Sequence, residues 1–567
     1  MNLTPEEIAV GKENFFAAIG SPAVRQKFLL EGIRQGIASR RGLGPYYFGY
    51  GKSVPEPLRV GVVGTGDEGS VLMGAMNPEF IEVRSISDIR PFSRYRAFHG
   101  ELGVPTRPGL LSVYGWKTED EARRHVKVYG GSYEELIGNA KQDGLEAVVI
   151  ALPLHLHAPA AIAAMQAGLH VITEKLMAHS VGQCKEMART AKKTNLYLAV
   201  GHQRHYSILY DNAVELIRRG VLGEIHYIRA QWHRGNLPGH DSWQQPLPPG
   251  VKPEKASEQL VKRLKDAKAK LAAASGKDVA EAERRAAQLA AQVADAVLHT
   301  GKDPKTGRPL AEALGYESRK IADYDRPAIE ELIRWRLWDR TGAGLMAELG
   351  SHQLDAASIF IAAMHGDKEK MPHPISVAAT ANRPLFPADR DIEDHVFCIF
   401  EFPAPGYNAK DPEAAKKKIG VQYASINGNG YGGYGETVLG TEGTLVLDRE
   451  QDVQLYKMAP SIGKTRVLTD KKSGRAKLDA AEAGDERSAA IGCQAMLEAE
   501  RGYAEELEHW AWCIRNAAPE NQPHCHPKVA LKDAVIALCA NQAARKGYRI
   551  DFQESWFDPD DPATPDA

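Results

Sequence analysis

The sequence predicts an α/β domain with a parallel sheet, followed by an α+β domain whose open sheet is mostly antiparallel and carries a helical insertion. Between about residues 58 and 205, short apolar runs alternate with helical segments, which is the pattern of βαβ units. Beyond residue 205 the strand-like runs lose that alternation. A stretch rich in Ala, Lys, Glu and Arg interrupts this second part.

Residues 1–57 are expected to form one or two helices and then a linker rich in Gly, Tyr and Pro. The domain at 58–205 follows, with helices expected at Ala158 to Ala167 and Val181 to Thr194. Its expected strands are apolar and bounded by turn residues, and they lie at 58–64, 81–88, 146–153, 169–175 and 196–201.

The second domain is expected to span residues 206–545. Its predicted strands lie at 225–232, 396–402, 421–427 and 444–447, and its last helices at 502–515 and 529–546. The tail, 546–567, ends in a polar, Pro-rich stretch from Asp558 to Ala567. Such a terminus is expected to fray.

The insertion lies at about residues 251–300. Leucine and valine recur there at helical spacing, and Ser275-Gly276 interrupts the pattern, so a helical hairpin is expected. A partner-binding role is conceivable, but a solvated amphipathic insertion is the favoured interpretation.

Charge and cysteine content exclude several classes of protein. The 567 residues carry a net charge of −2, which gives no reason to expect binding to nucleic acid or an anionic membrane. No apolar run approaches the roughly 18 residues of a membrane helix. Six scattered cysteines without a CxxC pair favour reduced thiols in the cytoplasm. His524-Cys525-His526 invites a metal interpretation, but without a second ligand cluster we predict no metal site.

A glycine-rich turn marks the candidate cofactor site. Gly64-Thr65-Gly66-Asp67-Glu68-Gly69 follows a strand and opens a helix, the context that a dinucleotide-binding Rossmann motif requires. The glycines permit a tight turn, a close approach of the backbone to a pyrophosphate, and helix packing, while the helix N-terminus favours phosphate.

Asp88 closes the second predicted strand. A carboxylate there accepts hydrogen bonds from the ribose hydroxyls and repels a 2′-phosphate, so NAD is favoured over NADP. Arg90 could soften this preference. The alternative for Asp88 is a helix or turn cap.

Lys175 follows the strand that ends in Thr173-Glu174. It is expected at the carboxyl edge of the sheet, where such folds bind ligands. There a lysine could bind a substrate hydroxyl and lower its pKa, although an ordinary surface lysine is equally compatible with this position.

Three stretches of the sequence together resemble a known family. They are the Gly64–Gly69 turn with Asp88, the run from Ala151-Leu-Pro153 through His157 to Glu174-Lys175, and Gly342 to Asp355 with Glu348 and His352. Gly440-Thr-Glu-Gly443 looks like a late sheet motif of the same family. The chain thus resembles the glucose–fructose oxidoreductase and inositol dehydrogenase family of NAD(P)-dependent oxidoreductases, over roughly 58–250 and 335–545.

The resemblance implies roles for individual residues. Lys175 matches a lysine that contacts the reacting carbinol, His352 matches a general acid/base, and Glu348 stands where many members have aspartate. Asp355 is expected to orient the site. Further residues are expected to line the dinucleotide pocket: Pro153, His157, Glu174 and Gln203. Leu176 replaces the proline of the family's Glu-Lys-Pro signature, which puts a cis peptide there in doubt.

The residue spacing agrees with these roles. Glu348 and His352 are four residues apart, so on an α-helix they share one face. A carboxylate beside an imidazole would raise its basicity and suit proton transfer near neutral pH. A helix-packing histidine is the alternative.

Aromatic and polar residues near the second domain's first strand suggest a sugar site. Packing at the sheet edge is an equally good explanation. The candidate substrate residues are His233, Arg234, Asn236, Trp335, Arg336 and Asp355.

The leading functional hypothesis is oxidation of a secondary carbinol of a sugar or polyol by NAD. One alternative is a glycosidase or lyase that uses bound NAD transiently through a keto-sugar. Another is a non-catalytic NAD-binding scaffold, against which Lys175 and His352 argue. The resemblance also implies a homodimer or homotetramer that pairs through the open face of the second sheet.

Overall fold

The computed structural model describes residues 3–21, 43–251, 254–365, 372–458, 462–470, 475–480 and 501–566. Within the predicted N-terminal extension it contains α1 (Pro5–Gly20) and α3 (Gly44–Phe48). Residues 22–42 of that extension lie outside the described ranges. Thr4 caps α1, since its side chain accepts from the Glu7 amide and the Glu7 side chain accepts from the Thr4 amide.

The first domain is built on a six-stranded parallel sheet of order β3-β2-β1-β4-β5-β6. The five predicted strands are confirmed, and the short, partly exposed β3 is an addition. The strands are β1 (Leu58–Val63), β2 (Ile81–Ser87), β3 (Lys127–Tyr129), β4 (Ala147–Ile150), β5 (His170–Glu174) and β6 (Leu198–Gly201). The principal helices are α4 (Asp67–Ala75), α5 (Pro91–His99), α8 (Tyr133–Asp143), α9 (His157–Gln166), α10 (Val181–Thr194) and α11 (Ile208–Arg218).

The second domain contains an eight-stranded sheet of order β15-β14-β13-β7-β12-β11-β10-β18. Among the described strands of this sheet, β7 and β12 pair in parallel and the other neighbours are antiparallel, as predicted. The strands are β7 (Ile225–His233), β10 (Ser376–Asn382), β11 (His395–Pro403), β12 (Lys418–Ile426), β13 (Tyr434–Gly440), β14 (Thr444–Asp448), β15 (Asp452–Tyr456) and β18 (Ile550–Asp551).

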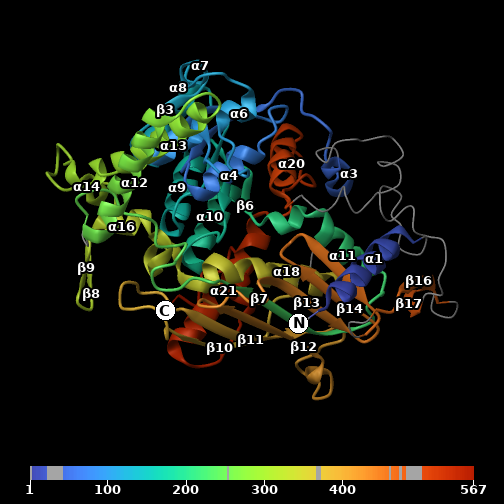
Figure 1. Ribbon diagram of the computed structural model, residues 1–567. Helices are drawn as coiled ribbons and strands as arrows, with labels where there is room; N and C mark the ends of the chain where they lie inside the picture. The colour runs from blue at the N-terminus through green and yellow to red at the C-terminus, as the bar shows by residue number, and fades with distance from the viewer. Residues whose placement is uncertain are drawn as a thin grey trace.

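Two helices fill the space between the two sheets, as Figure 1 shows. They are α18 (Ser351–His365) and α21 (Pro527–Lys546), and both are buried along most of their length. Strand β11 explains the layering, because Val396, Cys398 and Phe400 point into the core while Phe397 and Ile399 point outward. One face of the sheet therefore packs on helices, and the other stays open. The helix α20 (Tyr503–Arg515) was also predicted.

The insertion forms the predicted hairpin, α12 (Glu254–Ala273) and α13 (Asp278–Ala294). It also docks on the first domain, because α13 packs against α5. Asp295, just after α13, accepts hydrogen bonds from the Arg90 side chain at 2.9 Å and from the Phe92 amide at 2.9 Å. The chain continues through α14 (Val297–Thr300), α15 (Leu310–Ala313) and α16 (Ala328–Ile333). The insertion is solvated on its outer side only.

The expected fraying of the tail is wrong for residues 558–566. The Lys185 ammonium, on α10, donates to the carbonyl oxygens of Ser555, Asp561 and Ala563 at 2.7–2.8 Å. Asp566 accepts from the amides of Val181 and Gly182 at the start of α10, where a helix has unpaired donors. Composition alone predicted fraying, but specific polar partners on another element hold the segment.

Of the helices in the described ranges, none is both long and apolar enough to cross a membrane.

Candidate functional site

The glycine-rich turn between β1 and α4 has the geometry expected for a phosphate site. Gly64 has φ +82°, and a Cβ there would collide with the carbonyl of Ala151. A Cβ on Gly69 would collide with the carbonyl of Gly64. At Gly66, in contrast, the nearest atom is 3.9 Å from a Cβ position, so its free space is available to a ligand above the N-terminus of α4.

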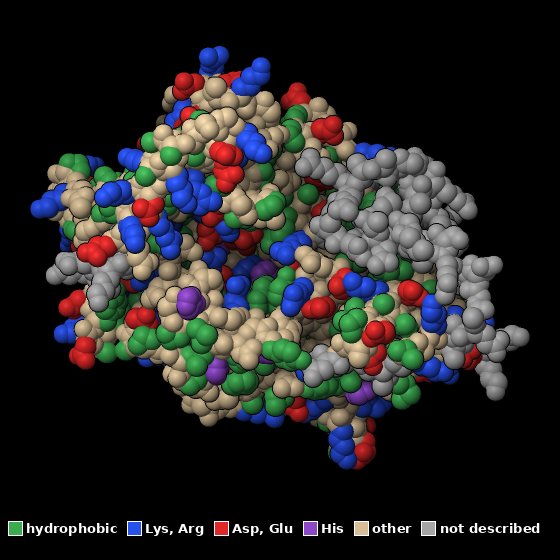
Figure 2. Space-filling view, in the orientation of Figure 1, with side chains coloured by type: hydrophobic (Ala, Val, Ile, Leu, Met, Phe, Trp, Pro, Cys, Tyr) green, Lys and Arg blue, Asp and Glu red, His purple; other side chains and the backbone are tan. Residues whose placement is uncertain are grey.

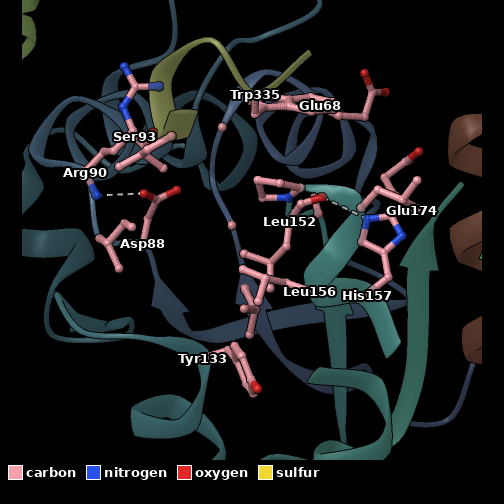
Figure 3. Close-up of a pocket in the computed structure, with 18 of the residues that line it drawn as sticks. Glu68, Asp88, Arg90, Ser93, Tyr133, Leu152, Leu156, His157, Glu174 and Trp335 are labelled. Atoms are coloured by element: carbon pink, nitrogen blue, oxygen red, sulfur yellow. Dashed lines mark hydrogen bonds between the residues drawn. The ribbon is translucent and has the colours of Figure 1, made fainter. Parts of the chain in front are cut away.

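Asp88 braces this turn and also borders the neighbouring cavity. Its carboxylate accepts from the amides of Thr65 and Arg90, each at 2.8 Å, and Figure 3 shows the second contact. Asp88 can thus cap the turn and also face a bound cofactor. Thr65 is fully buried and supports the turn from behind, where its hydroxyl donates to the Ser93 carbonyl.

Arg90 does not present a free charge to a ligand. Its Nε and Nη2 both lie 2.9 Å from Asp295. Burial would lower the pKa of Arg90, but Asp295 and Asp88 outweigh burial and raise it. The expectation that Arg90 softens the preference for NAD is therefore not supported, because its charge is already paired.

A cavity of about 400 Å³ runs along the carboxyl edge of the first sheet, a size typical of small-molecule sites. Figure 3 shows Asp88, Arg90 and Ser93 at one end and His157 and Glu174 at the other. Pro153 and His157 line it as predicted. Residues that follow the insertion close another side of it: Ala313, Leu314, Gly315, Tyr316 and Leu332. No sequence motif signalled these last residues.

Lys175, Glu348 and Arg336 meet at the inner end of the cavity. The Lys175 ammonium donates to the Glu348 carbonyl at 2.7 Å and lies 3.8 Å from its carboxylate. Arg336 donates to that carboxylate at 2.7 Å and also reaches Asp67 of α4 at 3.2 Å. Burial would raise the pKa of Glu348, but Lys175 and Arg336 outweigh burial and hold it below its usual value. Glu348 is therefore ionised.

Two further carboxyl groups, Glu174 and Glu68, border the same end. Burial, with the nearby Glu68, raises the pKa of Glu174 to about 8, and burial also raises the pKa of Glu68. Glu174 can therefore hold a proton near neutral pH. Sequence reasoning missed Glu68, although it lies inside the glycine motif.

His157 positions the segment that carries Lys175. Its ring nitrogens lie 2.8 Å from the carbonyl oxygens of Leu152 and Leu176, and Figure 3 shows the first contact. Burial lowers the pKa of His157, so the ring is neutral and donates to one of these carbonyls at a time. The Lys175–Leu176 peptide is cis, although leucine stands where the family has proline.

Figure 2 shows charged and histidine side chains gathered in a hollow near the middle of the face in view. His352 lies on α18 among aromatic and basic groups. Its ring centroid is 5.6 Å from that of Trp232 and 6.2 Å from that of His202. Burial, then the charges of Lys175 and Arg204, lower the pKa of His352 well below its usual value. The expectation that a neighbouring carboxylate raises its basicity is wrong.

A π-helical turn, Met346–Gly350, explains part of this difference. Glu348 lies in this π-helical turn, whereas an α-helix was expected to place Glu348 and His352 on one face. The Glu348 carboxylate pairs with Arg336 and Lys175 instead of with His352. His352 is thus a neutral imidazole that can accept a proton.

The remaining predicted residues divide into two groups. Trp335 and Arg336 border the cavity. Arg234 stacks between Trp232 and Trp243, 5.6 Å from each ring, and Asn236 braces its own loop by accepting from Ser242. Six more predicted residues are not among the described residues that border the cavity: Thr65, Gly69, Gln203, His233, His352 and Asp355.

Residues 58–202 match the model of an oxidoreductase family with an NAD-binding Rossmann fold, Gfo/Idh/MocA. The match covers the first domain only. The predicted resemblance is confirmed there, together with the two-domain fold.

Curated relatives and solved structures extend the comparison. An uncharacterised oxidoreductase of Schizosaccharomyces pombe is 34% identical over 152 residues, 25% of this chain and 40% of that protein. A glycosyl hydrolase family 109 protein of Shewanella baltica is 25% identical over 223 residues, 38% of this chain and 44% of that protein. The chain thus spans less than half the length of these relatives. An inositol dehydrogenase homologue of Azotobacter vinelandii, solved with NAD⁺, has a TM-score of 0.51 at 14% identity and covers 88% of this chain and 98% of its own. It shows the shared fold.

Proposed function

We propose that this protein is an NAD-dependent oxidoreductase that acts on a secondary carbinol of a sugar or polyol. The observation that carries the proposal is a single cavity with a phosphate-binding turn and Asp88 near one end and Lys175 beside Glu348 at the other. That arrangement suits a dinucleotide whose nicotinamide lies beside Lys175. The paired charge of Arg90 leaves Asp88 to favour NAD over NADP.

The residues around the inner end support this chemistry. The Lys175 ammonium can donate to the carbinol oxygen and stabilise negative charge as it develops there. Neutral His352, which is not among the described residues bordering the cavity, accepts the hydroxyl proton in this proposal from a substrate that extends toward Trp232. Bound NAD supplies the acceptor for the hydride that leaves the carbinol carbon. Glu348 holds the Lys175 ammonium in place through its carbonyl and carboxylate.

Substrate candidates come from the second domain. Trp335 offers an apolar face at the cavity, and Arg336 offers donors there. Trp232 and Arg234 lie beside His352 and extend this surface. Aromatic faces with a few hydrogen-bonding groups suit a sugar ring. His233, Asn236 and Asp355 are proposed to shape this site rather than to contact the substrate, since Asn236 and Asp355 are engaged elsewhere.

A second candidate is a glycosidase or lyase that uses NAD transiently. One observation favours it. Residues that follow the insertion line the Asp88 end of the cavity, and Asp295 binds the insertion to Arg90 of the first domain. A cofactor enclosed in this way exchanges slowly, which suits a reaction that returns the hydride within one turnover. The glycosyl hydrolase relative is in keeping with this possibility.

A panel of sugars, polyols and nitrophenyl glycosides separates these candidates. Each is incubated with and without added NAD and followed for NADH absorbance and for nitrophenol release. NADH formation supports the dehydrogenase, whereas nitrophenol release without NADH supports the transient use of NAD. Activity that survives in Lys175→Met would favour the scaffold interpretation, because the detected turnover would not involve this site.

We also propose a cytoplasmic homodimer or homotetramer that pairs through the open face of the second sheet. Ile399 is 60% exposed there and Phe397 lies beside it on β11. Five described cysteines are free thiols, in keeping with a reducing compartment. Light scattering of the purified protein and of Ile399→Glu tests the assembly, since a charge on that face should shift it toward monomer.

A further inference from the structure

Behind His352 lies a buried cluster of metal-ligand side chains. His202 follows β6, and His205 lies in the 3-10 turn Gln203–Tyr206. Asp355 comes from α18, Cys525 from the loop before α21, and Asp533 from α21 itself. Segments that are far apart in the sequence thus bring five nitrogen, oxygen and sulfur donors to one place.

The donor atoms are closely spaced. Asp355 lies 2.8 Å from His205 Nε2 and 3.6 Å from His202 Nδ1, and Asp533 lies 4.0 Å from His202 Nε2. Two triads each have their donor atoms within 4.8 Å of one another, and Asp533 belongs to both. The triads are His202, Asp355 and Asp533, and His205, Cys525 and Asp533. Tetrahedral zinc separates its nitrogen and oxygen ligands by roughly 3.3 Å, so small side-chain movements suffice.

The cluster is buried, and the ring of His202 in it is unsatisfied. Relative exposures are 1% for His202 and Asp355 and 2% for Asp533. Both ring nitrogens of His202 have no hydrogen-bond partner among the described groups. Leaving a buried polar atom without a partner is unfavourable. A cation at the centre would give one of these nitrogens a partner.

Charge balance points the same way. Two carboxyl groups, Asp355 and Asp533, belong to one buried triad whose donor atoms lie within 4.8 Å of one another. Two carboxylates cannot both stay ionised in such a place without a proton or a cation between them.

We propose that His202, His205, Asp355, Cys525 and Asp533 form a binding site for one divalent transition metal of the zinc type. The mixture of imidazole, carboxylate and thiol favours zinc over magnesium or calcium, which prefer oxygen ligands alone. His202, Asp355 and Asp533 supply three ligands, and His205 or Cys525 completes the set. We assign the site a structural role, because His202, Asp355 and Asp533 are all buried.

Such a metal would connect the first domain to α18 and α21. It would fix His202, whose ring lies 6.2 Å from that of His352, and thereby position the proposed proton acceptor. The inference does not depend on the proposed reaction, because metal binding is measured directly.

The neighbours of Cys525 in sequence are not members of the cluster. His524 stacks on Tyr206 and contacts the His205 carbonyl, while His526 caps α21 by accepting from the Lys528 amide. Cys525 instead meets His205 and Asp533, which are distant in sequence and gave no spacing signal.

The test is metal analysis of the full-length protein after chelator treatment, reloading with zinc and gel filtration. We expect about one zinc per chain in the wild type and a loss of most of it in Asp533→Asn. Cys539→Ser, a buried cysteine on α21 outside the cluster, should keep its zinc. Circular dichroism of each protein verifies that it is folded.

Cobalt(II) loading gives a second readout that does not need Asp533→Asn to fold. We expect visible absorption bands of tetrahedral cobalt in the wild type and in Cys539→Ser, and a strong weakening in His202→Gln. A folded wild type that takes up no zinc, or that binds cobalt equally well in His202→Gln, overturns the proposal. The two aspartates would then be a carboxyl pair sharing a proton.

Discussion

Replacing Asp295 with alanine should loosen the insertion from the first domain. The Asp295 side chain is 1% exposed and accepts from Arg90 Nε and Nη2 and from the Phe92 amide, each at 2.9 Å. Its removal leaves the Arg90 guanidinium without its carboxylate and the Phe92 amide without its acceptor.

Breaking a buried ion pair in this way costs about 3–5 kcal/mol. The Arg90 side chain is 18% exposed and regains some hydration, so the lower end, about 3 kcal/mol, applies. At about 1.4 kcal/mol per tenfold change, the undocked fraction of the insertion should rise roughly 100-fold. The second domain should keep its stability, because α13 contacts the first domain through α5.

Limited trypsin digestion measures this fraction, since cleavage under mild conditions follows the population of the open form. Lys262 and Arg284 provide sites on α12 and α13. Asp266→Ala, an exposed change on α12, is the matched control. Release of preloaded NADH should accelerate in Asp295→Ala as well. If both variants are cleaved at the same rate, Asp295 does not hold the insertion, and the insertion does not enclose the cofactor.

Three further perturbations test the site. Lys175→Met should lower kcat about 10²–10³-fold with little change in NADH affinity by fluorescence titration; an unchanged kcat would contradict the assigned role. Gly69→Ala should weaken NADH binding and lower the free energy of unfolding by about 1–3 kcal/mol in thermal melts, because its Cβ would collide with the Gly64 carbonyl. Gly138→Ala is the control: no atom lies within 4 Å of its Cβ position, so its stability should be unchanged or higher. The pKa of Glu174 is raised from 4.5 to about 8 in the folded protein, so between these two pH values folding takes up a proton. The stability of the wild type therefore falls as pH rises through this range, by up to about 1.4 kcal/mol per pH unit. The urea midpoint of Glu174→Gln should therefore gain on the wild type between about pH 5 and about pH 8, and a constant difference would refute this.

Local patterns predicted the first domain well. Apolar strands, the glycine turn and Asp88 are short-range signals, and the structure places them as expected. Lys175 was placed correctly for the same reason, because the end of a parallel strand defines its position.

Features set by long-range packing could not be predicted in the same way. The low pKa of His352 depends on burial and on Lys175, Arg204 and Arg234, which come from other elements. The pairing of Arg90 depends on Asp295, 205 residues away. The order of the tail depends on the partners that α10 provides through Lys185. Spacing along one segment carries no information about such partners.

The anchoring of Lys185 also bears on how a ligand reaches the cavity. Three carbonyl bonds and the Asp566 contacts fasten the last residues to α10, and α10 packs directly on α21 of the other domain. A hinge motion between the domains would have to break these hydrogen bonds and the packing of α10 on α21 together. We therefore expect the two domains to move as one rigid body. A dinucleotide would then enter and leave when the insertion undocks from the first domain.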